Sequence, residues 1–490
     1  MEYIFNHYYL LRHDEKRSIL FSHVDTVSSV SVNKDWLSCI HPIYAMMLSF
    51  FSKPITKEKA IEKIADFFDF SQDYTANLVE KFIENKEEFH TEFCGHNNNF
   101  PKNIIIRADQ TCYKMRVYTP DMFVYSDLDF KTFRLYSAPL YITFMVNNRC
   151  LTNCVYCYAD RGTRCKNMNF SQVEKIIDMA HDANIQNIDL DGGEFFIYPH
   201  WKRLLEKLQM YEYKPRIVST KYPVSEDDIA QFSTFGISLQ VSLDSLNQKT
   251  LDNMVGAIKD YSTKMRQTII TIDKYMPFQV ATILTKFNTS IDDLEQMYSF
   301  FCTTKRIRRW EIRVGFKSLY SKNDFNNIRI EPGDINKIYL WVSEKRKDAP
   351  FEIKWSPGRE VNFFKSKNGG QDFIGGRCSG NTIHFFVLPD GKVTICEQLY
   401  WKKNFIIGDL TKQTIAEVWK SNKAMYLANM QQKDYSDDSK CKSCDIFDKC
   451  HSYMNKCYAN ILKAYGDEHW DYPDPRCARA PRNISDKIYV

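Results

Sequence analysis

The sequence lacks any apolar run long enough to cross a membrane. Hydrophobic residues make up 44% of its 490 residues, but no stretch approaches the roughly 20 consecutive apolar residues that a spanning helix needs. The start, MEYIFNHYYLLRHDEK, has no basic segment followed by an apolar one, which argues against a secretory signal. We therefore expect a cytoplasmic protein with no membrane among its partners.

An excess of charge of one sign is also missing. Lys and Arg number 66 and Asp and Glu 61, a net charge of +5, and like charges do not gather in blocks. Such a balance is typical of an ordinary solvated surface, so nucleic acid is not expected as a partner. The length and the 14% of aromatic residues indicate a globular chain of two to four domains.

Cysteine, in contrast, is abundant, with 15 in the chain. Disulfides are improbable in a cytosolic protein, so clustered cysteines point to metal or redox chemistry. Ten cysteines fall into two clusters, one near residue 150 and one beyond residue 377. The scattered ones are interpreted as small buried side chains: Cys39, Cys94, Cys112, Cys165 and Cys302.

Residues 1–95 read as a separate α+β unit. Aromatic and β-branched residues predict strands at 7–14, 18–23 and 26–32. Apolar periodicity then predicts helices at 41–52, 56–68 and 72–89, with Thr56 and Ser71 as N-caps of the last two. Three strands followed by three helices resemble the winged-helix-like, PqqD-like recognition element of peptide-modifying enzymes. A DNA-binding winged helix and a structural cap are the alternatives.

Residues 96–137 are expected to be a linker, with the boundary at the turn-rich stretch 97–103. From 138 to 347 strands and helices alternate in six βα units, which predicts a partial (β/α)6 barrel. The chemistry of such barrels lies at the C-terminal ends of the strands. The predicted strands lie at 140–146, 187–193, 216–220, 238–244, 278–284 and 310–315, and the helices at 171–183, 200–212, 225–233, 247–264, 291–302 and 335–346.

The loop after the first barrel strand, CLTNCVYCYADRG, has the spacing C-x3-C-x2-C in Cys150, Cys154 and Cys157. Three thiolates leave one iron of a [4Fe–4S] cluster open to another ligand. This spacing, with Tyr156 before the third cysteine, resembles the signature of the radical S-adenosylmethionine (SAM) superfamily. The resemblance implies that SAM chelates the open iron and is cleaved to a 5′-deoxyadenosyl radical. A zinc site completed by Cys165 is the alternative.

Markers at the ends of later strands support the resemblance. In the family, a Gly-Gly-Glu motif after the second strand holds the ammonium of SAM, polar groups after the fourth strand hold its carboxylate or ribose, and the fifth strand packs on adenine. The matching positions are Gly192, Gly193 and Glu194, then Ser219 and Thr220 at the end of the third strand, Ser242 and Asp244 after the fourth, and Ile283 on the fifth. One departure is the step Val255-Gly256, where an Arg is common; Lys264 or Arg266 could serve the carboxylate instead.

The last 120 residues carry the second cysteine cluster. Its members are Cys378, Cys396, Cys441, Cys444, Cys450, Cys457 and Cys477. With Gly391 before Cys396 and a hairpin expected at 387–396, the pattern over 370–490 resembles the iron–sulfur SPASM domain, although the gap from Cys450 to Cys457 is longer than usual. A pair of zinc knuckles is the alternative.

The SPASM resemblance implies two auxiliary [4Fe–4S] clusters, which with the SAM cluster makes three. Cys378, Cys396 and Cys457 would hold the first and the other four cysteines the second. The first then lacks one protein ligand. His384 stands where some family members have an extra cysteine, and we interpret it as an ordinary strand residue.

Together the three parts resemble a radical SAM/SPASM maturase of a ribosomally synthesised peptide. The precursor's leader would add a strand to the N-terminal sheet, and a flavodoxin or ferredoxin would supply electrons. We expect a C–S or C–C cross-link. The alternatives are epimerisation, which needs a hydrogen donor such as Cys302 or Cys165, a sulfatase-type maturase that forms formylglycine, and a cluster-bearing regulator.

Overall fold

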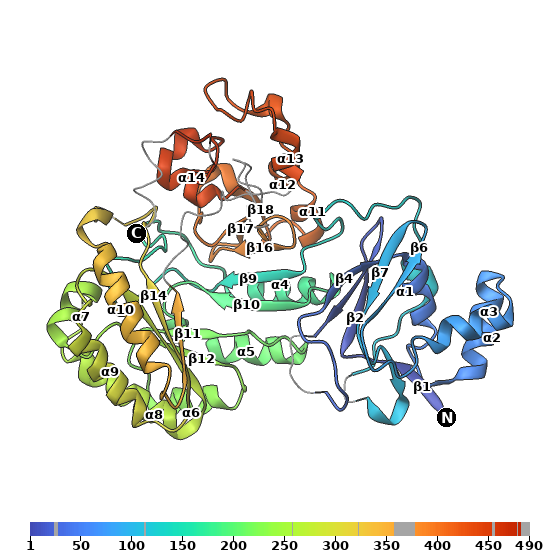
Figure 1. Ribbon diagram of the computed structural model, residues 1–490, viewed down its shortest axis with the longest axis horizontal. Helices are drawn as coiled ribbons and strands as arrows, with labels where there is room; N and C mark the ends of the chain where they lie inside the picture. Colours follow the sequence, from blue (N-terminus) through green and yellow to red (C-terminus); the bar gives the residue numbers. More distant parts are fainter. Residues whose placement is uncertain are drawn as a thin grey trace. The chain divides into compact units, whose positions relative to one another are not determined.

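The computed structural model describes the chain except for residues 24–27, 112–113, 257, 322, 357–377, 453–455, 478 and 482–490. The chain divides into two compact units. The first comprises Met1–Tyr141 and Met179–Asn187, and the second Ile142–Asp178 and Ile188–Val490. Figure 1 labels most of the helices and strands of both.

The first unit contains three small antiparallel sheets. One joins β2 (Tyr9–His13), β3 (Ser18–Ser22) and β4 (Leu37–Ile40) in that order, and a second joins β5 (Ile55–Thr56), β1 (Glu2–Phe5) and β8 (Ile105–Arg107). The third is a hairpin of β6 (Phe89–Phe93) and β7 (His96–Phe100). The helices are α1 (Pro42–Ser49), α2 (Lys57–Phe68) and α3 (Gln72–Glu80).

The first two expected strands and both N-caps are present. The side chains of Thr56 and Ser71 accept the N–H groups of Lys59 and Tyr74. The third expected strand is wrong, because the described residues 28–32 have no regular structure and β4 pairs with β3 instead. None of the residues 28–32 is fully buried, whereas Ile40 in β4 is.

The helix expected at 72–89 ends at Glu80. Residues 89–93 alternate between half-buried and exposed side chains and pair with β7, which is the period of a strand. The linker expected at 96–137 differs too. Its apolar residues lie in the core of the first unit with Leu20, Ile40 and Phe51; they are Phe100, Ile104, Ile105, Tyr118 and Phe123. The compact unit therefore extends to Tyr141.

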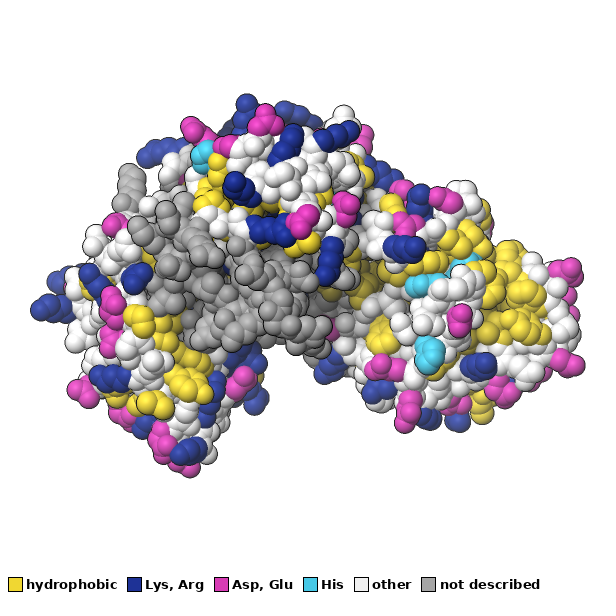
Figure 2. Space-filling model, turned by 45° about the horizontal axis from the view of Figure 1, so that its top comes forward, with side chains coloured by type: hydrophobic (Ala, Val, Ile, Leu, Met, Phe, Trp, Pro, Cys, Tyr) yellow, Lys and Arg dark blue, Asp and Glu magenta, His cyan; other side chains and the backbone are white. Residues whose placement is uncertain are grey.

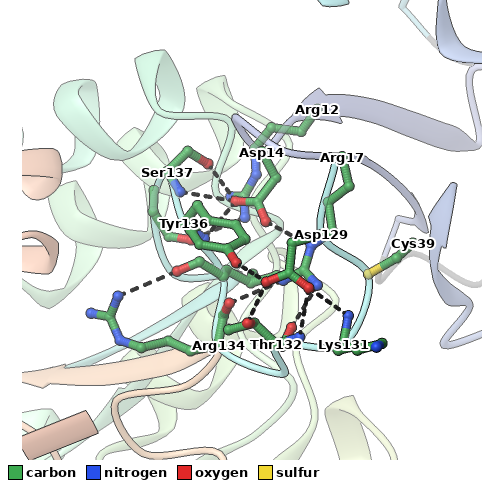
Figure 3. A network of polar contacts seen from close by, with 12 residues as sticks. Arg12, Asp14, Arg17, Cys39, Asp129, Lys131, Thr132, Arg134, Tyr136 and Ser137 are labelled. Carbon is green, nitrogen blue, oxygen red and sulfur yellow. Dashed lines mark hydrogen bonds and ion pairs between the residues drawn. The ribbon is translucent and has the colours of Figure 1, made fainter. Parts of the chain in front are cut away.

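A buried ion pair fixes the end of this segment (Figure 3). Asp14 is fully buried, and its Oδ2 accepts a hydrogen bond of 3.1 Å from Nε of Arg17, which is 1% exposed. The Asp14 Oδ1 atom accepts the backbone N–H groups of Tyr136 (2.8 Å) and Ser137 (2.9 Å). Arg17 in turn donates to the carbonyl oxygen of Thr132. The pair thereby joins the β2–β3 turn to residues 132–137.

The second unit has a parallel sheet of β11 (Val218–Thr220), β12 (Leu239–Ser242), β13 (Phe278–Leu284), β14 (Ile307–Val314) and β15 (Glu352–Ser356). Its helices are the part of α4 (Phe170–Asp182) up to Asp178, α5 (Trp201–Met210), α6 (Glu226–Ser233), α7 (Gln248–Val255), α8 (Tyr261–Tyr275), α9 (Ile291–Cys302) and α10 (Pro332–Lys345). With β9 (Tyr141–Met145) and β10 (Asn187–Asp191), all six expected barrel strands are present, and the fold class is confirmed.

Two details of the barrel differ from expectation. The helix expected at 247–264 is two helices, because Gly256 adopts a left-handed conformation (φ +56°) that ends α7. The strands β9 and β10 belong to a sheet whose order is β10-β9-β16-β17-β18. The C-terminal hairpin of β16 and β17 thus pairs with β9, the first barrel strand. This sheet is completed by β16 (His384–Val387), β17 (Lys392–Thr394) and β18 (Ile406–Asp409).

The remaining C-terminal residues form short helices around the cysteines. They are α11 (Ile415–Trp419), α12 (Asn422–Ala428), α13 (Phe447–Ser452) and α14 (Tyr458–Tyr465). Short 3₁₀ helices elsewhere in the chain span Ala108–Gln110, Pro120–Phe123, Phe195–Ile197, Phe325–Asn327, Lys403–Phe405, Gln432–Asp434 and Asp467–His469. Within the described residues, helices long and apolar enough to cross a membrane are absent.

The Asp14–Arg17 pair yields a stability prediction. Asp14→Ala leaves the buried guanidinium of Arg17 without its counter-charge and two backbone N–H groups without their acceptor, and should destabilise the protein by about 3–5 kcal/mol. Thermal unfolding followed by circular dichroism measures the loss. The matched control is Lys16→Ala, which removes the neighbouring exposed ion pair with Asp127 and should leave the melting temperature unchanged. Equal melting temperatures for both variants would contradict the role given to Asp14.

Candidate functional site

The three-cysteine loop between β9 and α4 is attached to the end of α7. The N–H of Asn153 donates to the carbonyl oxygen of Val255 (2.7 Å), and the N–H of Val155 to that of Met254 (2.8 Å). A Cβ on Gly256 would lie 3.2 Å from the Cβ of Asn153, a tight contact, and the φ of +56° disfavours any side chain at this position. The Val255-Gly256 step therefore serves to hold the cysteine loop.

The glycines after β10 permit an equally close approach. The N–H of Gly193 donates to the carbonyl oxygen of Asn147 (2.6 Å), and that of Glu194 to Arg149 (2.7 Å). A Cβ on Gly193 would lie 2.0 Å from the carbonyl oxygen of Arg149. The backbone after β10 thus packs directly on the residues that precede Cys150 and fixes Glu194 beside the loop.

Glu194 is 4% exposed and lies across the ends of two strands. Its carboxylate accepts hydrogen bonds from the hydroxyl of Thr220 (2.8 Å) and from the backbone N–H of Lys221 (2.9 Å). Burial raises the pKa of Glu194 to about 7, against the lowering effect of these two donors. A cationic ligand group would offset that burial, so the carboxylate is suited to an ammonium.

Asp244 connects the loop to three other strand ends. It is fully buried; its Oδ1 accepts the N–H of Ile283 (2.9 Å), and its Oδ2 accepts both the hydroxyl of Tyr156 and Nζ of Lys221 (2.7 Å). Tyr156 and Asp244 were expected from separate motifs, and the structure joins them by a hydrogen bond. Sequence reasoning missed Lys221, for which the only signal was its place directly after the third strand.

Other expected residues differ in placement. Ser242 is the half-buried last residue of β12, and Gly192 has φ +129° in the turn after β10. Ser219 is exposed, because successive strand residues face opposite sides and Thr220 takes the inward position.

The loop thiols lie close to one another and to Lys221. Burial and the neighbouring thiol of Cys157 raise the pKa of Cys150 to about 12, and burial also raises that of Cys157. Burial acts to lower the pKa of Lys221, but Asp244 and the thiol of Cys154 raise it above its usual value. Lys221 therefore remains a cation, and binding of a metal would replace the protons of the thiols.

Cys165 and Cys302 lie away from this group. The half-buried thiol of Cys165 donates to the side chain of Asn167, with Asp390 and Lys392 among its charged neighbours. Cys302 is exposed at the C-terminal end of α9. Because α9 connects the parallel strands β13 and β14, it ends at the opposite edge of the sheet from the cysteine loop. Cys94 is exposed as well, and Cys112 lies outside the described residues.

The seven C-terminal cysteines line one apolar cavity of about 100 Å³. Its walls also include Tyr435, Tyr458, Lys456 and His451. Among the described residues, three His, Cys, Asp or Glu side chains never converge tightly enough to hold one metal ion.

Electrostatic neighbours divide the seven thiols into two groups. The thiols of Cys378 and Cys457 raise the pKa of Cys396, in addition to the larger effect of burial. Burial raises the pKa of Cys450 to about 12, and the neighbouring thiols of Cys441, Cys444 and Cys477 raise it as well. The division into three and four thiols that the SPASM resemblance implies stays a prediction.

His384 lies on β16, apart from the cavity. Its Nε2 is 2.9 Å from the hydroxyl of Thr143 on β9, and its ring packs at 4.4 Å from that of Phe386. Burial lowers the pKa of His384 to about 4. These contacts agree with its interpretation as a strand residue.

Each C-terminal thiol group has a buried lysine beside it. Lys463 lies near the thiols of Cys457 and Cys396, and burial lowers its pKa to about 8. Lys456 lies near Cys441 and Cys450, and burial lowers its pKa as well. Lys221 takes the same place beside the loop thiols.

Comparison with known proteins places these motifs in families. Residues 144–301 match the model of the Radical SAM superfamily, and residues 378–445 match that of SPASM, an iron–sulfur cluster-binding domain.

Two curated relatives match parts of the chain. It is 22% identical over 165 residues to the antilisterial bacteriocin subtilosin biosynthesis protein AlbA of Bacillus subtilis (strain 168), covering 33% of this chain and 37% of that protein. It is 27% identical over 126 residues to a probable GTP 3′,8-cyclase of Methanothermobacter thermautotrophicus, covering 25% of this chain and 41% of that protein. The chain thus spans about two fifths of the length of these relatives.

Among solved structures, Streptococcus suis SuiB is similar over nearly the whole chain. The form bound to its precursor peptide SuiA has a TM-score of 0.63 at 14% identity, covering 98% of this chain and 100% of that one. The form bound to S-adenosylmethionine has a TM-score of 0.60 at 14% identity, covering 97% of this chain and 100% of that one. The chain therefore contains a radical SAM domain and an iron–sulfur SPASM domain, on a fold shared with SuiB.

Proposed function

We propose that the protein is a radical SAM enzyme that modifies a ribosomally synthesised peptide. The observation that carries the proposal is the convergence of the cysteine loop, Glu194 and Asp244 at the C-terminal ends of the barrel strands. The similarity to SuiB, solved with a precursor peptide, and to AlbA, named for the biosynthesis of a bacteriocin, supports a peptide as substrate.

The residues at the loop fit an iron–sulfur cluster and SAM. Cys150, Cys154 and Cys157 supply three thiols to a [4Fe–4S] cluster and leave one iron for SAM. Glu194 binds the ammonium, and Asp244, fixed by Tyr156, faces the polar part of the ligand. When bound, these groups supply a 5′-deoxyadenosyl radical that abstracts hydrogen from the peptide. The glycine contacts keep the loop and Glu194 in register.

The C-terminal thiols fit two further clusters. Cys378, Cys396 and Cys457 form one donor set, and the other four cysteines form the second. Such clusters supply an electron acceptor, which the closure of a C–S or C–C cross-link requires because it removes two hydrogens from the peptide. Epimerisation is redox-neutral and needs a hydrogen donor near the loop. We therefore favour cross-linking, with a flavodoxin or ferredoxin as the external reductant.

The function is tested by co-expression with the short open reading frame beside the gene, followed by mass spectrometry of the peptide. Each cross-link should lower the peptide mass by about 2 Da, the mass of the two hydrogens removed. Cys154→Ala removes one cluster ligand and should yield unmodified peptide. An unchanged mass with an inverted residue would indicate epimerisation instead, and modification by the Cys154→Ala variant would contradict the site.

The cluster count is tested by iron analysis. Anaerobically reconstituted protein should contain about twelve irons if all three clusters are [4Fe–4S]. Cys154→Ala should lose about four of them, as should Cys450→Ala. Cys302→Ala is the control, because the exposed thiol lies outside both donor sets. About four irons in the unaltered protein would contradict the auxiliary clusters.

We also propose that the first unit is a PqqD-like element that binds the precursor's leader. Both edges of the β2-β3-β4 sheet already have partners: the Leu11 N–H donates to the hydroxyl of Tyr118 (3.3 Å), and the Cys39 carbonyl oxygen lies 3.2 Å from Nε2 of His96. Addition of a strand would displace these contacts. We therefore assign leader binding to an apolar pocket between the helices.

That pocket lies beside α1, α2 and α3, where Figure 2 shows apolar side chains gathered on the surface. It is lined by Ile43, Tyr44, Met47, Ile64, Phe68, Phe70, Tyr74, Leu78 and Phe93. Tyr74 is 50% exposed and packs on Phe70, with ring centroids 5.1 Å apart. Asp66, Asp69 and Asp73, which neighbour this aromatic pair in the sequence, have exposed side chains. The pocket therefore suits a leader segment with large apolar side chains beside basic residues.

Leader binding is tested with the double variant Phe70→Ala and Tyr74→Ala. Loss of two aromatic contacts should weaken binding of a fluorescently labelled precursor by roughly ten-fold or more, measured by anisotropy. Tyr339→Ala is the matched control, because Tyr339 is 47% exposed on α10, far from the pocket in sequence. Unchanged affinity in the double variant would discard this pocket as the leader site.

A further inference from the structure

Lys221 is a half-buried lysine that the motifs of the sequence do not explain. Its side chain is 15% exposed, and its Nζ lies 2.7 Å from Oδ2 of Asp244. The Nζ atom also lies 5.5 Å from the ring centroid of Tyr156, next to the thiols of Cys154 and Cys157. A lysine with this little contact with solvent is stabilised by an anionic partner, and Asp244 supplies one.

The backbone of Lys221 fixes where this cation lies. Its N–H donates to Oε2 of Glu194 (2.9 Å), and its carbonyl oxygen accepts the hydroxyl of Tyr261 (2.8 Å). The main chain of Lys221 thus contacts Glu194, and its side chain contacts Asp244, which follows the next strand, β12. The ammonium and carboxylate of SAM are attached to the same carbon, so their partners in the protein must be close neighbours.

The other basic residues considered for the carboxylate lie elsewhere. Lys264 is exposed, and its Nζ donates to the carbonyl oxygen of Lys259 (3.1 Å). The guanidinium of Arg266 lies over the ring of Phe300 on α9 at 5.2 Å. Arg161, near the loop, already donates to the carbonyl oxygen of Thr152 and the side chain of Asn153. At the Val255-Gly256 step the chain offers no side-chain charge.

We propose that Lys221 binds the carboxylate of SAM, opposite Glu194 at the ammonium. This inference rests on the proposed function, since it requires SAM at the cysteine loop. Asp244 holds the ammonium of Lys221 in place, and the bound carboxylate becomes its second anionic partner. Lys221, which follows β11, would thus bind the carboxylate in place of the arginine that is common at the position of the Val255-Gly256 step. Because Gly256 is needed to hold the loop, a cation from β11 is the alternative that this packing permits.

The test compares two ligands that differ only in the carboxylate. Reconstituted Lys221→Met, Lys221→Arg and Lys264→Met variants are titrated anaerobically at pH 8 with SAM and with decarboxylated SAM, and dissociation constants are measured by calorimetry. Lys221→Met should weaken SAM binding by roughly ten-fold or more, the effect of losing a buried charge-assisted hydrogen bond. It should leave binding of decarboxylated SAM unchanged. Lys221→Arg should retain part of the SAM affinity, and Lys264→Met all of it.

Each other outcome overturns a defined statement. Equal SAM affinity in Lys221→Met and the unaltered protein, or an equal loss for both ligands, refutes the assignment of Lys221. If the unaltered protein with a full iron content binds neither ligand, the proposed function fails instead. Iron content and binding of decarboxylated SAM report whether Lys221→Met is folded; should it lose iron, Lys221→Gln, which keeps a hydrogen-bonding group beside Asp244, replaces it in the same comparison.

Discussion

The structure of the second unit depends on how it buries thiol sulfur. A thiolate taken out of water is costly unless a metal or a cation compensates its charge, and the cost grows when several lie together. The described residues include three such groups, and each has one buried or half-buried lysine beside it: Lys221, Lys456 and Lys463. In the C-terminal groups burial lowers the lysine pKa, so these cations depend on the sulfur charge as much as the sulfur depends on them. The charge of each lysine therefore offsets the charge of the sulfur atoms beside it, and metal binding is coupled to local folding.

A second constraint is the close approach of backbone around the loop. Gly193 and Gly256 lie where a Cβ would contact the residues beside Cys150 and Cys154. Their hydrogen bonds join β9, β10 and the end of α7 into one rigid support for the loop. The left-handed backbone and the tight contact with Asn153 favour glycine at position 256, and the cation that we assign to the SAM carboxylate comes from the end of β11 instead.

Much of the barrel could be predicted from the sequence, because its strands are apolar runs and its motifs follow the strand ends directly. Tyr156, Glu194 and Asp244 were identified in this way. Lys221 was not, since a lysine after a strand is ordinary and only its burial distinguishes it. In the first unit, local pattern misplaced the third strand and treated residues 96–137 as a linker. Both errors concern segments ordered by distant partners, such as the contact of Asp14 with Tyr136, which periodicity does not reveal.

The positions of the remaining cysteines bear on the kind of product. Epimerisation needs a hydrogen donor at the barrel mouth, and a thiol is the candidate that the sequence offers. Cys302 lies at the edge of the sheet opposite the cysteine loop. The thiol of Cys165 donates a hydrogen bond to Asn167 and has Asp390 and Lys392 as charged neighbours. The other described thiols of the second unit belong to the cluster groups, where metal would occupy them. With its thiols committed in this way, the unit is better arranged to remove electrons from a peptide radical than to return hydrogen to it. The same sulfur that must be neutralised for the unit to fold thereby favours a net oxidation.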